Sequence, residues 1–156
     1  MSSTKAFRGF VPARMKGGAY NNEAVTDMIT LTSTGQAQTP SNNIFTGDPF
    51  ILPGTNLATI TPFINVTLKP SGVFMGCQYV ENGEQKFSRY WPGGTSATDV
   101  KFFVITNPDQ TYHIQCSLTL SAAEAAICLN YPVTVSSTAS SGNTITGQSS
   151  YYLLAA

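Results

Sequence analysis

The stretch that decides the fold runs from residue 73 to residue 94 and reads VFMGCQYVENGEQKFSRYWPGG. Two aromatic and β-branched runs flank Asn82 and Gly83, and Asn followed by Gly is the strongest short-range indication of a β-hairpin. A two-residue loop would place Glu81 opposite Glu84 and divide the apolar residues between both sheet faces. We therefore predict a three-residue loop over residues 81–83, in which Gly83 takes the left-handed position of a bulge that follows a type I turn.

This register predicts which side chains of the hairpin are buried. One face carries the apolar set Val73, Met75, Cys77, Tyr79, Phe87 and Trp91. The other face is mostly polar, and Tyr90 lies on it. Pro92 and the two glycines after it end the second strand, because proline cannot donate to a ladder. Trp91, the only tryptophan of the chain, is therefore expected in the core.

The composition favours a single domain with a neutral, hydroxyl-rich surface. A chain of 156 residues is long enough for one self-sufficient core. Charged residues make up 10% of it, against about 25% in an average soluble domain. Such a surface is typical of a protein whose exterior is committed to contacts, or of one held outside the cell. No run of about 18 apolar residues and no signal-peptide core is found, so we expect synthesis in the cytoplasm and no membrane partner.

The first 25 residues predict an extended arm, followed by one domain over residues 26–156. Half of the eight basic residues lie here, and no acidic residue precedes Glu23: Lys5, Arg8, Arg14 and Lys16. Four charges without a stripe of stacking aromatics do not predict nucleic-acid binding, and a solvated tail remains an alternative. The arm also contains apolar residues that favour order against another surface, either its own barrel or a partner: Phe7, Phe10, Val11 and Tyr20.

The remaining pattern predicts an all-β fold. Short strands are expected near residues 26–32, 44–52, 57–61, 63–68, 99–106, 111–118 and 133–135, with a final apolar anchor at 151–154. One short helix is expected from Ser121 to Asn130, because Ser121 and Glu124 form a capping box. Strands of this length and spacing predict a small β-barrel or sandwich with one short helix and the N-terminal arm.

Groups that could perform catalysis are sparse, so we expect a non-enzymatic protein without cofactor or metal. The single histidine, His113, lies in a predicted strand, where a structural role is the usual one. Cys77, Cys116 and Cys128 lack the spacing of a zinc site, and their odd number among apolar neighbours favours free buried thiols. No nucleophile elbow, phosphate-binding loop or metal-ligand cluster is present in the sequence.

Several motifs resemble a known family. They are FRGFVPAR at residues 7–14, IFTGDP at 44–49, GVFMGC at 72–77 with YWPGG at 90–94, a weaker match from Asp99 to Asp109, and TGQS at 146–149. In these the chain resembles the head decoration, or cement, proteins of tailed bacteriophages. The resemblance implies a structural protein on the outer surface of the virion that binds the shell of the major capsid protein and stabilises the DNA-filled head. Self-association on the shell, as a dimer or trimer, is a further expectation.

Two functional hypotheses follow, and they use different residues. In the first, the arm lies on the shell as a strap, through the contact residues Phe7, Arg8, Phe10, Val11, Arg14 and Tyr20. The alternative is a receptor-binding or glycan-binding head-fibre module, in which Trp91, Tyr90 and Tyr79 form an exposed platform for a sugar. An enzyme would instead require His113 beside a carboxylate.

Overall fold

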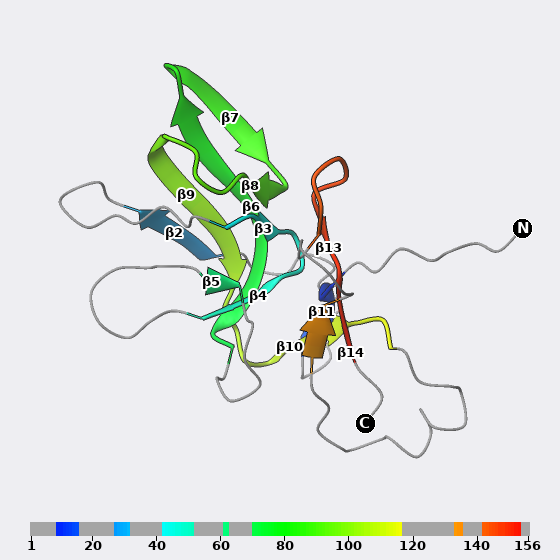
Figure 1. Cartoon of the computed structure of the whole chain (residues 1–156). Coiled ribbons are helices and arrows are strands. Elements are labelled where there is room, and N and C mark those ends of the chain that lie inside the picture. The colour runs from blue at the N-terminus through cyan, green and yellow to red at the C-terminus, as the bar shows by residue number, and fades with distance from the viewer. Residues whose placement is uncertain are drawn as a thin grey trace, which may run out of the picture.

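The computed structural model describes residues 9–15, 27–31, 42–51, 61–62, 70–116, 133–135 and 142–153. Within these ranges the chain forms strands and no helix (Figure 1). The strands are β1 Val11–Met15, β2 Asp27–Leu31, β3 Ile44–Phe45, β4 Pro49–Ile51, β5 Thr61–Pro62, β6 Gly72–Glu81, β7 Glu84–Ser88, β8 Tyr90–Trp91, β9 Thr98–Ile105, β10 Gln110–His113, β11 Val133–Val135, β12 Gly142–Asn143, β13 Gln148–Ser149 and β14 Tyr151–Leu153. The predicted all-β class is confirmed as a sandwich-like arrangement and not as a closed barrel. The predicted helix at residues 121–130 lies outside the described residues.

The central sheet is built around the long strand β6. Its strand order is β2-β9-β6-β4-β5, with β7 also paired to β6. Strand β9 runs antiparallel along one edge of β6, while β4 pairs with the start of the other edge and β7 with its end. The other described strands form two-stranded sheets, in the pairs β1-β10, β3-β8, β11-β14 and β12-β13.

Both faces of the central sheet are covered near the start of β6. Val73 and Phe74 are both buried although neighbouring side chains in a strand point to opposite faces. Phe74 belongs to the main core cluster together with Val104, its partner on β9. Val73 lies on the other face, beside its partner Ile105, which is also buried. Burial on both faces is what makes this end of the fold sandwich-like.

The main core is an aromatic cluster centred on Trp91. This side chain is 0% exposed, and its ring meets those of Tyr79 and Phe102 edge to face, with centroids 5.3 and 5.4 Å away. Phe74 packs on Phe102 in the same way, at 5.5 Å. Such pairs contribute roughly 0.5–1.5 kcal/mol beyond their buried area. The predicted burial of Trp91 is therefore observed.

The predicted register of the β6–β7 hairpin is wrong. Glu81 pairs with Glu84, so the loop contains only Asn82 and Gly83. Their φ angles of 54° and 81° are those of a type I′ turn, whose twist matches that of the strands. The expected repulsion between the two glutamates is offset because Lys86 Nζ donates a hydrogen bond to Glu81 Oε2. Lys86 lies two residues after Glu84 on β7. Because it pairs with Glu81, repulsion between the two glutamates no longer argues against the two-residue loop.

The shorter loop also corrects the position of Phe87. In the observed register Phe87 pairs with Gln78, and it is 70% exposed. The prediction placed Phe87 on the buried face with Tyr79 and Trp91, but a one-residue change of register moves a side chain to the opposite face. The burial argument failed here because the core reaches this hairpin on the face that carries Tyr79, whereas Phe87 lies on the opposite face of a hairpin that projects beyond the rest of the sheet (Figure 1).

The described part of the N-terminal arm is a strand of the domain itself. Val11–Met15 pairs antiparallel with β10, with Val11 opposite His113 and Pro12 opposite Tyr112. The ring of Phe10 meets that of Tyr112 edge to face, with centroids 5.8 Å apart. For residues 9–15 the alternative of order against the chain's own domain is therefore observed, and the hypothesis of a separate strap lying on a shell is wrong. The other predicted arm contacts Phe7, Arg8 and Tyr20 lie outside the described residues, and only the backbone of Arg14 is described.

Candidate functional site

The turn at residues 46–48 is the point where distant parts of the chain are tied together. Thr46 N donates to both Arg89 O and Gly147 O at 3.0 Å. The Thr46 hydroxyl donates to Met75 O at 3.0 Å, and Thr46 O accepts from Ser149 N at 3.0 Å. A single residue thus connects β6, the segment between β7 and β8, and the β12–β13 hairpin.

The next two residues extend this junction to the N-terminal strand. Phe10 N donates to Gly47 O at 2.9 Å, and Gly47 N donates to Phe74 O at 2.8 Å. Asp48 O accepts from Phe74 N at 2.9 Å. We call residues 46–48, together with the segments they bind, the junction. Its hydrogen bonds satisfy backbone groups that would be costly to bury unpaired.

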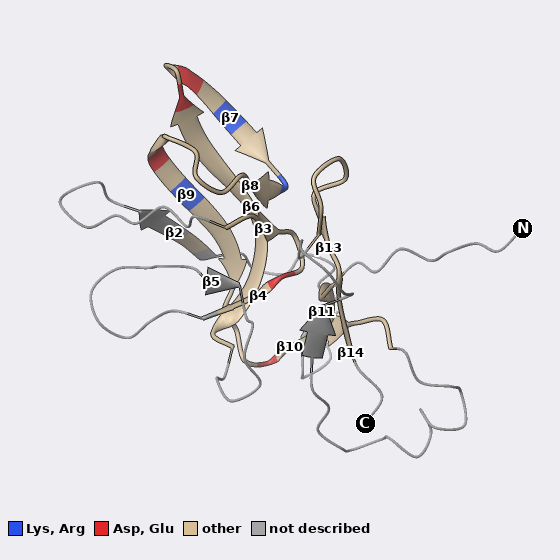
Figure 2. Ribbon diagram, in the orientation of Figure 1, with Lys and Arg blue, Asp and Glu red and all other residues tan. Residues whose placement is uncertain are grey.

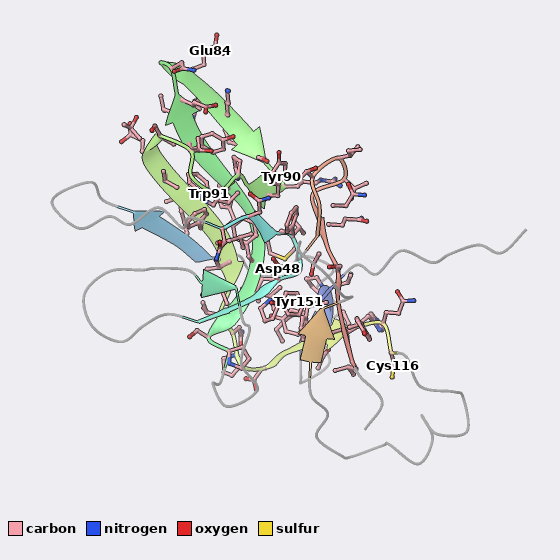
Figure 3. The ribbon with its side chains drawn as sticks, viewed as in Figure 1. Asp48, Glu84, Tyr90, Trp91, Cys116 and Tyr151 are labelled. Atoms are coloured by element: carbon pink, nitrogen blue, oxygen red, sulfur yellow. The ribbon has the colours of Figure 1, made fainter. Side chains whose placement is uncertain are left out.

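Asp48 is a buried carboxylate that holds the turn in shape. Its Oδ2 accepts a hydrogen bond from Phe45 N at 2.9 Å, and its own N–H donates to Phe45 O at 2.9 Å. Tyr151 lies close to it (Figure 3). Burial raises the pKa of the Tyr151 hydroxyl, and the neighbouring charge of Asp48 raises it further. Asp48 therefore has a role in the local structure of the turn.

The motifs that carry the family resemblance meet at the junction. Phe10, Gly47, Phe74 and Gly147 belong to four of them, and hydrogen bonds of the turn at 46–48 connect them. The fold therefore accounts for the motif residues that form these bonds. Val11, also within a motif, is 42% exposed.

The β12–β13 hairpin presents one apolar side chain to solvent. Ile145 lies in its turn and is 94% exposed. The turn is fixed by Asn143, whose Oδ1 accepts from Ile145 N at 2.8 Å and from Thr146 N at 3.2 Å, while its backbone O accepts from Gly147 N at 2.7 Å. Residues 142–153 contain no charged side chain, and Figure 2 shows this hairpin without acidic or basic positions. In the sequence, the signal of this turn is an isoleucine between two threonines, bracketed by Asn143 and Gly147.

The β6–β7 hairpin presents a second exposed apolar side chain, in a charged setting. Phe87 is 70% exposed, and Figure 2 shows acidic positions at the hairpin tip with a basic position beside them on β7. Glu84 lies at the far end of this projection (Figure 3). The hydrogen bond to Glu81 raises the pKa of Lys86, so it favours the charged ammonium. The two hairpins therefore differ in chemistry, one uncharged and one bearing both signs of charge.

The exposed aromatic platform of the glycan-binding alternative is not found. Trp91 is fully buried and Tyr79 is 6% exposed. Tyr90 is half-buried, and its ring stacks on that of Phe45 with centroids 5.5 Å apart and an interplanar angle of 15°. The buried rings of Trp91 and Tyr79 offer no face to a sugar, and one face of the Tyr90 ring is covered by Phe45. That part of the alternative is therefore wrong.

The other residues considered in the sequence occupy separate places. His113 is exposed at the end of β10, opposite Val11. Cys77 is buried, its Sγ lies 3.4 Å from Tyr90 O, and burial raises its pKa from 9.0 to about 12, which suppresses thiolate chemistry. Cys116 is half-buried, and Cys128 lies outside the described residues. In the described ranges no group of three or more metal-ligating side chains occurs, and no helix long and apolar enough to cross a membrane is found there.

Comparison of the chain with family models, with curated proteins and with solved structures gave no match.

Proposed function

We propose that this protein is a non-enzymatic virion component, a capsid decoration protein that binds the outer surface of the major capsid protein shell and stabilises the DNA-filled head. Three properties of the chain support this proposal. Its motifs resemble those of the phage decoration family, its charged fraction is 10%, and a rigid uncharged projection carries Ile145 into solvent. The last of these carries the proposal, because it supplies a surface suited to a protein partner. The protein would be made in the host cytoplasm and would act on the finished shell.

Ile145 has the properties of an anchor residue. Its turn is held by hydrogen bonds to Asn143, so little conformational entropy remains to be lost when a partner covers it. Complete burial of such a side chain contributes roughly 1.5–3 kcal/mol. The hydroxyls of Thr144 and Thr146 on either side suit the polar rim that surrounds an apolar contact. One such anchor is weak alone, but the repeated subunits of a shell offer the same contact many times.

This contact makes a different prediction from the basic arm. The β12–β13 hairpin has no charge, so binding through Ile145 should change little with salt concentration. Binding through the four basic residues of the first sixteen positions would weaken as salt rises, because added ions screen exposed charges. Salt dependence therefore separates the two surfaces without any mutation.

Co-sedimentation with purified shells that lack the protein tests the proposal. We expect the wild type to bind, Ile145→Ser to lose roughly 10-fold to 100-fold in affinity, and the salt concentration to have little effect. Met28→Ser is the matched control, because Met28 is also exposed, at 56%, but lies on β2 in the central sheet. Absence of wild-type binding to the shell would refute the decoration role. Binding that is equal for wild type and Ile145→Ser would keep the role but remove Ile145 as its anchor.

A further inference from the structure

Strand β7 has an outer edge. The register of its pairing with β6 determines which of its backbone N–H and C=O groups point outward. Glu81 and Glu84 flank a two-residue turn and so exchange hydrogen bonds with each other. Antiparallel pairs alternate between hydrogen-bonded and non-hydrogen-bonded, so Lys86 and Ser88 also bond to β6. The N–H and C=O groups of Gln85 and Phe87 consequently point away from β6. Within the described residues β7 pairs with β6 alone.

The same edge is closed at its lower end. By the alternation, Arg89 also directs its carbonyl outward, and there it accepts hydrogen bonds from the backbone N–H and the hydroxyl of Thr46. Gly147 packs against the Cβ of Arg89, so the β12–β13 hairpin lies next to this position. The observed bond at Arg89 confirms the assigned direction of the alternate residues. It also limits an added strand to the part of β7 that ends at Phe87.

We propose that this edge pairs with β7 of a second copy of the chain, in antiparallel orientation about a two-fold axis. Only one such register uses both outward residues and avoids Thr46. It places Gln85 opposite Phe87 of the second copy, and Phe87 opposite Gln85 of the second copy, and forms four backbone hydrogen bonds. Pairing Phe87 with itself would bring Gln85 of the second copy against Arg89, where Thr46 already lies. Pairing Gln85 with itself would leave Phe87 facing only the turn glycine.

The side chains of β7 are self-complementary in this register. Each Phe87, 70% exposed in the single chain, would be covered by Gln85 of the other copy and by the second Phe87 diagonally across. Each Glu84 would lie diagonal to Lys86 of the other copy, so opposite charges meet twice. The two Lys86 side chains face each other across the axis, but each already has Glu81 as its ion-pair partner. These features, with a net charge of zero for the chain, favour a second copy over a partner of another kind.

This dimer contact is separate from the shell contact proposed above. It uses β7, whereas the shell contact uses the turn of β12–β13, so either can hold without the other. A lysine on an edge strand often protects that edge from pairing. Here the ion pair with Glu81 removes part of that protection, because the ammonium is held against its own hairpin.

A cross-link through one introduced cysteine tests the register directly. Lys86 is the residue that faces itself across the axis, in a non-hydrogen-bonded pair with Cα atoms about 4.5 Å apart, within the range for a disulfide. We expect Lys86→Cys to give a covalent dimer with oxidised glutathione. The matched control Glu84→Cys, whose two copies would be separated by roughly 13 Å, should not. Wild-type protein under the same oxidant controls for the native cysteines.

The mass of the protein in solution gives a second test. Analytical ultracentrifugation should show a concentration-dependent dimer for the wild type. Gln85→Pro removes an outward N–H without touching the β6 ladder and should weaken the dimer at least tenfold, as should Phe87→Ser, with far-ultraviolet circular dichroism confirming that both fold. A monomeric wild type at every concentration would overturn the proposal. A dimer that resists both substitutions, or equal cross-linking of Lys86→Cys and Glu84→Cys, would overturn it equally.

Discussion

Replacing Gly147 by alanine should destabilise the fold well beyond the cost of its backbone conformation. Gly147 has a φ of 69°, and a Cβ there would lie 2.6 Å from the Cβ of Arg89. That atom is next to the backbone of a residue fixed by Thr46, so it cannot move aside cheaply. Gly83 supplies a matched control, because its φ is 81° and a Cβ there meets nothing within 4 Å. The two substitutions share the backbone strain and differ in the contact.

The expected magnitudes follow from these two terms. A left-handed conformation costs an alanine roughly 1–2 kcal/mol relative to glycine, which is the whole expected loss for Gly83→Ala. Overpacking in a fixed environment adds about 1–3 kcal/mol. Gly147→Ala should therefore lose roughly 2–5 kcal/mol. For a chain of this size the additional term corresponds to a further drop in Tm of about 2–4 °C per kcal/mol.

Urea denaturation followed by tryptophan fluorescence measures both losses, because Trp91 is buried in the native state. Gly94→Ala is a second control, with a φ of 74° and open space around its Cβ. The loss in the free energy of unfolding should be larger for Gly147→Ala than for either control variant. Equal free-energy losses at all three positions would refute the view that the β12–β13 hairpin is tightly packed on the junction.

Two further predictions concern the core. Trp91→Ala should cost about 3–5 kcal/mol in the free energy of unfolding, and a near-native urea midpoint would contradict the packing of Trp91 on Tyr79 and Phe102. Burial raises the pKa of Cys77 from 9.0 to about 12, so the unfolded chain releases this proton first; stability should be unaffected below about pH 9 and should fall between about pH 9 and 12. Cys77→Ser should flatten that fall in a Tm series across this range, and an unchanged slope would show that Cys77 is not its source.

The sequence predicted those features that depend on local pattern. The strand that leads into the Asn82-Gly83 turn, the turn itself and a strand near residues 99–106, observed at 98–105, were expected from alternation and turn chemistry. The register of the hairpin was not, because it depended on the charge of a residue beyond the turn. Lys86 reaches Glu81 across the strands, and this contact offsets the Glu81–Glu84 repulsion on which the predicted register was based.

The N-terminal strand shows a different limit. Residues 11–15 have no alternating pattern that would identify a strand, and their partner, β10, lies almost one hundred residues further along the chain. The turn at Gly47 binds the backbone of Phe10, the residue that precedes this strand. The local sequence gives no indication of that distant contact. When distant backbone contacts order a segment, the local sequence gives little indication of that order. The strap hypothesis therefore interpreted the apolar residues of the arm as a surface for a partner.

The site illustrates why recognisable motifs and functional surfaces need not coincide. A motif such as IFTGDP is distinctive because a tight turn, a buried carboxylate and bonds to distant segments each restrict the residue at their position. An exposed residue has no such restriction from the fold. Ile145 and Phe87 lie outside the restricted backbone positions, in a turn tip and on a strand edge, and what they contact depends on a partner. The motifs therefore indicate the fold. The proposed shell and dimer contacts depend instead on two exposed side chains, whose identity the fold does not restrict.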